Sequence, residues 1–159
     1  MRDRSEPLDE HELIARGRAI VDANLYLVLG TADAEGRPWV SPVYFAPDGY
    51  RDFYWVSRPE RTHSQNIEQR PEISIVVFDS SVPISTGQAV YMSAVAQQLA
   101  GDEREPAIEV FSRRSLSHGG VEWSVGDVEA PARLRLYRAR ALYQYVLNAD
   151  DNRIPVTLW

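Results

Sequence analysis

Side chains that could bind an anion are concentrated in the segment 57–64, where an apolar run ends and a helical pattern begins. Ser57 is followed by Arg61, Thr62, His63 and Ser64. The first turn of a helix has free backbone N–H groups and a partial positive charge, so these hydroxyl, guanidinium and imidazole groups favour phosphate binding there. Ser and Thr are also ordinary helix caps, and the arginines could simply be solvated. The segment therefore indicates either a phosphate-binding turn or a common helix start.

Two absent residue types narrow the chemistry that the chain can perform. All 17 basic residues are arginine, and the chain has no cysteine. Without cysteine there is no disulfide, thiolate zinc site, cysteine nucleophile or cysteine-ligated iron–sulfur cluster. Without lysine there is neither a Schiff-base lysine nor a P-loop lysine. His11 and His118 have no second ligand at metal spacing, so we predict no metal site and assign no catalytic residue.

Composition and charge exclude further classes of protein. The net charge of −6 argues against non-specific nucleic-acid binding, because the phosphate backbone favours a basic surface. No apolar run approaches the ~20 residues that span a bilayer. Residues 1–6 lack the apolar region of a secretory signal, which predicts a cytoplasmic location. At 159 residues without internal linkers or repeats, the chain is expected to form a single domain over 1–159.

The hydrophobic pattern predicts a mainly β, antiparallel fold around the anion-binding segment. Helices are expected at 9–23, 61–70 and 102–117, the first with Asp9 and Glu12 as a capping box. Strands are expected at 25–31, 38–45, 52–57, 73–78, 88–96, 133–147 and 154–158. Pro42 cannot donate a ladder hydrogen bond, so its strand should lie at an edge or a bulge. The order lacks a βαβ rhythm, which favours a barrel or sandwich.

Several short motifs over residues 22–96 together resemble the pyridoxamine 5'-phosphate oxidase-like split barrels. They are Gly36-Arg37-Pro38, Ser41-Pro42-Val43-Tyr44, Phe53-Tyr54-Trp55-Val56-Ser57, Arg61-Thr62-His63-Ser64, Asn66, Pro71-Glu72-Ile73-Ser74 and Gly87-Gln88-Ala89-Val90. The resemblance implies a homodimeric, antiparallel split β-barrel with flanking helices. It also implies that FMN binds across the dimer interface.

The resemblance assigns cofactor contacts to segments of both subunits. The contacts implied for the isoalloxazine ring are Ser41, Pro42, Val43, Tyr44 and Gln88. Val56 and Ser57 would lie beneath the ring and the ribityl chain, and Arg61, Thr62 and His63 would hold the phosphate. From the second subunit the implied contacts are Tyr143 and Arg153.

The resemblance implies a flavin-dependent oxidoreductase that acts on a small organic substrate. Thr62-His63 stands where the oxidases have an Arg-Lys pair, and the C-terminal stretch lacks their Arg-x-His substrate signature. Two alternatives therefore stay open: an F420-dependent reductase on the same fold, and a flavin- or haem-binding module without turnover. Residues 102–126 resemble the family least and are expected to form a wall of the substrate pocket.

Overall fold

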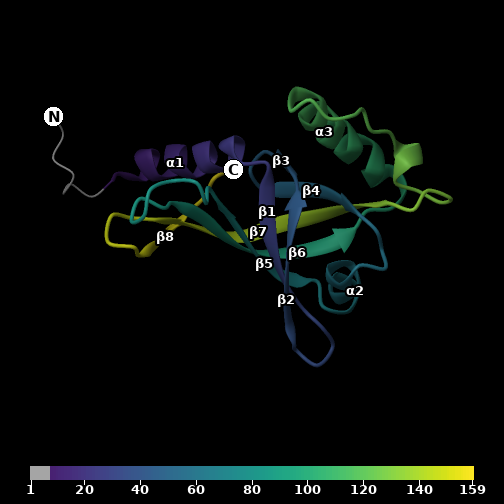
Figure 1. Cartoon of the computed structure of the whole chain (residues 1–159), viewed down its shortest axis with the longest axis horizontal. Helices are drawn as coiled ribbons and strands as arrows, with labels where there is room; N and C mark the ends of the chain where they lie inside the picture. Colours follow the sequence, from purple (N-terminus) through teal and green to yellow (C-terminus); the bar gives the residue numbers. More distant parts are fainter. Residues whose placement is uncertain (1–7) are drawn as a thin grey trace.

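The computed structural model describes residues 8–159, which form a curled antiparallel sheet flanked by helices α1, α2 and α3 (Figure 1). Residues 1–7, on which the predicted cytoplasmic location partly depends, lie outside the described residues. The strands are β1 (Tyr26–Ala32), β2 (Pro38–Tyr44), β3 (Ala46–Asp48), β4 (Asp52–Ser57), β5 (Glu72–Phe78), β6 (Ala89–Gln98), β7 (Arg135–Leu147) and β8 (Arg153–Val156). Their order in the sheet is β2-β1-β5-β6-β7-β4-β3, and β8 pairs with β7.

The sheet curls until its two ends meet. Strand β2 contacts β4 although the two strands are far apart in the pairing order. A register shift after Ser93 bends β6 and β7, as β-bulges do. In the described part of the chain, strand β2 pairs only with β1 and places Pro42 opposite Val28, so the expected edge position of the proline strand is confirmed. The result is a half-open barrel whose edge strand lies beside the end of β4.

Helix α1 (Glu10–Ala23) covers the part of the sheet formed by β5 to β8. Its predicted capping box is confirmed: Asp9 accepts a hydrogen bond from the Glu12 backbone at 2.8 Å, and the Glu12 side chain accepts one from the Asp9 backbone at 3.2 Å. Gly17 lets the C-terminal segment pack beneath this helix, because a Cβ at that position would lie 2.7 Å from Leu158 Cδ2. Helix α1 and the chain end therefore stabilise each other.

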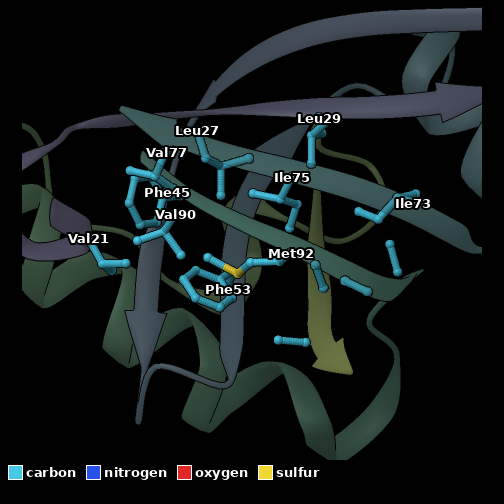
Figure 2. Close-up of a cluster of buried hydrophobic side chains, with 14 of the residues drawn as sticks. Val21, Leu27, Leu29, Phe45, Phe53, Ile73, Ile75, Val77, Val90 and Met92 are labelled. Carbon is cyan, nitrogen blue, oxygen red and sulfur yellow. The ribbon is translucent and has the colours of Figure 1, made fainter. Parts of the chain in front are cut away.

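The core lies between the inner face of the sheet and helix α1, where Figure 2 shows side chains from β1, β5 and β6 pointing toward one another. Leu27, Leu29, Ile75 and Val77 alternate with more exposed positions on their strands. This alternation buries one face of the sheet and leaves the other face free.

A second, smaller cluster forms under α3 (Arg104–Ser117), which packs on β3 and β4. Its Ile108 and Phe111 are buried, and the helix expected at 102–117 is the one that carries them. The 3-10 helices η1 (Gly101–Glu103) and η2 (Val125–Asp127) flank α3. Strand β3 was not expected, because Pro47-Asp48-Gly49 is also typical of a turn.

Candidate functional site

The segment between β4 and α2 (Thr62–Gln69) presents an uncapped helix start. Arg61 is the N-cap residue, and among residues 8–159 no side chain caps the first turn by accepting a hydrogen bond from it. The first intrahelical bond of this turn runs from the Gln65 N–H to the Arg61 carbonyl. The N–H groups before Gln65 have no acceptor inside a helix, so the first turn keeps donors available for a bound anion.

The side chains of this turn divide between solvent and interior. Arg61 and Thr62 are exposed, and within residues 8–159 neither side chain makes a hydrogen bond or an ion pair. His63 is buried, and its Nε2 lies 2.9 Å from Ser57 Oγ. Burial, and then the nearby Arg61 charge, lower the pKa of His63, so its imidazole is neutral at physiological pH. His63 thus holds the Ser57 hydroxyl, while Arg61 and Thr62 face outward.

Helix α2 is fastened to the β1–β2 hairpin by a buried hydrogen-bond chain. Asn66 Nδ2 donates to Thr31 Oγ1 at 3.0 Å, and Thr31 Oγ1 donates to the Trp39 carbonyl at 3.3 Å. Asn66 and Thr31 are almost fully buried, so these bonds are shielded from water. These hydrogen bonds hold the uncapped start of α2 next to β2, the strand that carries four of the implied ring contacts.

The end of β2 joins the outer part of the same site. Tyr44 and Val56 both pack on the cluster under α3. The Tyr44 hydroxyl lies 2.9 Å from His118 Nδ1, and its ring packs edge-on against Phe111. Burial raises the pKa of Tyr44, so the phenol stays protonated. His118 is a site residue that sequence reasoning missed, because its partner is 74 positions away and no local signal connects the two.

The remaining β2 residues take different positions along the strand. Ser41 Oγ accepts a hydrogen bond from Trp39 Nε1 at 3.1 Å. Pro42 is exposed and Val43 is buried in the main core. The structure therefore brings the β2 segment, the end of β4 and the start of α2 to one region.

Three implied cofactor residues lie at the opposite end of the sheet. Gln88 precedes β6, and its Oε1 accepts a hydrogen bond from Arg16 at 3.1 Å. Tyr143 is 65% exposed on β7, and the Arg153 guanidinium lies over the Tyr91 ring. Ser57 pairs with Arg135, the first residue of β7. Tyr143 lies eight residues further along this strand, a distance of about 26 Å. A single chain does not bring these three residues to the turn.

The face of the sheet opposite the core is uncharged over two rows of paired residues. One row runs from β2 to β8 through Pro42, Val28, Val76, Tyr91, Tyr145 and Pro155. The next row runs from β2 to β7 through Val40, Gly30, Ser74, Ser93 and Tyr143. We call these two rows the outer face. Valine side chains and tyrosine rings make up much of these rows, and exposed apolar groups gathered on one face are typical of an interaction site.

Residues 8–159 show neither a metal-binding cluster nor a membrane-spanning helix. Their His, Asp and Glu side chains nowhere gather in a group of three that could hold a metal ion. None of their helices combines the length and apolar character needed to cross a bilayer.

Residues 14–147 match the family model described as pyridoxamine 5'-phosphate oxidase, and the chain belongs to this family. The expected family and the antiparallel split-barrel fold with flanking helices are thereby confirmed. No curated protein sequence matches the chain.

Solved structures share the fold at low sequence identity. The heme storage protein HutZ from Vibrio cholerae has a TM-score of 0.65 and 20% identity, over 81% of this chain and 90% of that one. A heme binding protein from Mycobacterium smegmatis has a TM-score of 0.68 and 18% identity, over 88% of this chain and 55% of that one. An F420 reductase has a TM-score of 0.59 and 19% identity, over 80% of this chain and 94% of that one. Similar folds thus occur in proteins named for different ligands.

Proposed function

We propose that this member of the pyridoxamine 5'-phosphate oxidase family is a homodimeric FMN-dependent oxidoreductase that acts on a small organic substrate. The observation that carries the proposal is the uncapped start of α2, with the unpaired Arg61 side chain, fastened beside an edge strand. When bound, the flavin supplies the two-electron chemistry, and the protein supplies placement and electrostatics. This division of roles fits a chain without cysteine or lysine.

The phosphate end of the cofactor fits the first turn of α2. In the proposal the free N–H groups of this turn and the Arg61 guanidinium bind the phosphate oxygens, and the Thr62 hydroxyl adds a donor. A neutral, buried His63 is a weak partner for a dianion, so its ring orients the Ser57 hydroxyl toward the ribityl chain instead. His63 then contributes to the phosphate site through its backbone N–H.

The ring end fits the free edge of β2. Because β2 pairs only with β1, backbone groups along its other side have no partner strand. Alternate residues of an antiparallel strand direct their backbone groups to opposite sides, and the Phe45 N–H donates to the Leu25 carbonyl. Ser41 and Val43 therefore face β1 in the same way, whereas Tyr44 can offer its N–H and C=O, and Pro42 its C=O, to the polar edge of the isoalloxazine. The half-buried Val56 supplies an apolar contact beneath the ring.

The outer face is the proposed dimer interface. Its two rows of paired residues are uncharged and run across the sheet, as suits a self-complementary surface that a second chain covers. Tyr143 and Arg153 lie far from the turn of their own chain, so they reach the flavin only from the partner subunit. Gln88 shares their end of the sheet.

The cofactor that co-purifies with the native protein tests the proposal. We expect flavin absorbance bands and release of FMN on denaturation, identified by mass spectrometry. After the co-purified cofactor has been removed, titration of the protein with FMN, F420 and haemin ranks the three ligands by affinity. Tight binding of F420 without FMN would assign the chain to the deazaflavin reductases. A Soret band with no flavin binding would make it a haem module, and either result would overturn the proposal. A cytoplasmic location and the absence of a nucleic-acid partner stay predictions.

A further inference from the structure

A cavity of about 450 Å³ opens beside the proposed phosphate-binding turn. One wall is Arg58, which directly follows the last residue of β4, and the other is formed by two segments, 121–123 with 126–127 and 132–134. Val121, Trp123 and Leu134 give the cavity an apolar side, and Arg133 adds a second guanidinium. The cavity thus combines a surface for a planar group with two cationic side chains.

Both guanidinium groups are free of partners within the described chain. Neither Arg58 nor Arg133 makes a hydrogen bond or ion pair through its side chain with residues 8–159. Two acidic residues line the same cavity. The Asp127 carboxylate accepts bonds from Ser124 N and Oγ, both at 2.8 Å, and these bonds lower its pKa. Glu122 is exposed and pairs with neither arginine. The donors of the two arginines therefore stay available to a ligand.

The wall of the cavity opposite Arg58 is held by hydrogen bonds. The Trp123 N–H of the backbone donates to the buried Ser112 Oγ at 2.8 Å. Arg135 donates to the carbonyls of Ala132 and Leu134, both at 2.6 Å, which fixes the turn that carries Arg133. The wall opposite Arg58 is therefore restrained in both of its segments, which reduces the conformational entropy lost when a ligand binds.

We propose that this cavity binds the carboxylate end of a planar organic acid, and that this acid is the substrate class of the enzyme. Two guanidinium forks match the oxygens of a carboxylate, and the indole with its apolar neighbours suits a flat ring. The Trp123 indole packs on the same cluster as Tyr44 and Val56, which places the acid next to the proposed flavin. The assignment as substrate rests on the proposed function, whereas the anion site itself does not.

Binding of 4-nitrobenzoate to the full chain, without added cofactor, tests the site. The chain has four tryptophans, so NMR resolves their indole N–H signals, and Trp123→Phe identifies that of Trp123. We expect 4-nitrobenzoate to shift this signal and to bind about tenfold more tightly than the neutral 4-nitrobenzyl alcohol. Arg58→Gln and Arg133→Gln should each weaken the acid about tenfold or more and leave the alcohol unchanged.

Arg113→Gln is the matched control, because Arg113 is exposed on α3 and has no side-chain partner within residues 8–159. It should leave both affinities unchanged. Equal affinities for acid and alcohol, or acid binding that survives both arginine substitutions in folded protein, would overturn the proposal. If the acid binds but FMN does not, the anion site stands and the proposed oxidoreductase function is wrong. If FMN binds but the acid does not, the function stands and the substrate site is wrong.

Discussion

Substitution of Arg61 by alanine isolates the proposed phosphate contact from the stability of the fold. Arg61 is exposed and its side chain has no partner within residues 8–159, so its loss should change the free energy of unfolding by no more than about 0.5 kcal/mol. The proposed contact is charge-assisted, and such a bond contributes about 1.5–3 kcal/mol. The Kd for FMN should therefore rise about 10- to 150-fold.

Riboflavin provides the matched ligand, because it has the same ring and ribityl chain but no phosphate. We expect Arg61→Ala to leave the Kd for riboflavin unchanged, and Arg113→Ala to leave both affinities unchanged. Quenching of flavin fluorescence measures the Kd of the original protein and of each variant for both ligands. The reasoning is refuted if Arg61→Ala weakens riboflavin as much as FMN, or if neither Kd changes.

Three further perturbations test the proposed dimer, the anchoring of α2 and the buried histidine. Val76→Arg places a charge in the middle of the outer face, so light scattering should show monomers that no longer retain FMN. Asn66→Leu leaves Thr31 with one buried hydrogen bond fewer, and urea unfolding should show a loss of about 1–3 kcal/mol. Burial and Arg61 hold the pKa of His63 below its ordinary value of 6.5, so the unfolded chain takes up this proton first. The contribution of His63 to the free energy of unfolding should therefore be fully present above pH 6.5 and be lost as the pH falls toward the lower pKa of the folded state. Urea unfolding of His63→Gln should not show this pH-dependent loss.

Local signals predicted most of the fold. The Asp9–Glu12 capping box and the edge position of Pro42 depend on residues within a few positions of each other, and both are confirmed. Strand β7 begins at Arg135, two residues later than predicted, because Arg135 bonds back to the carbonyls of the preceding turn. Pairing between distant strands leaves no such local signal, so the register that forms the outer face became visible only in the structure.

The resemblance implied a site formed by β2, the end of β4 and the start of α2, and the structure brings these segments to one region. Cofactor binding there stays a prediction, and the side chains differ in orientation from what was expected. His63 was expected at the phosphate, whereas the structure buries it against Ser57. A signal for this existed: His63 lies four positions before the apolar Ile67 on the same helix face, so both turn toward the core. The contact between Tyr44 and His118 depends on the placement of α3 and had no counterpart in the sequence pattern.

Complementation between two defective chains tests most directly whether a flavin site is shared by two subunits, as we propose. Arg61→Ala removes a proposed contact from one side of each site, and Arg153→Ala removes one contributed by the partner subunit. When the two variants are unfolded, mixed and refolded, a mixed dimer has one intact site and one doubly defective site. Random mixing then predicts that about a quarter of all sites regain the original FMN affinity. A mixture that binds FMN no better than the two variants measured separately would contradict the account.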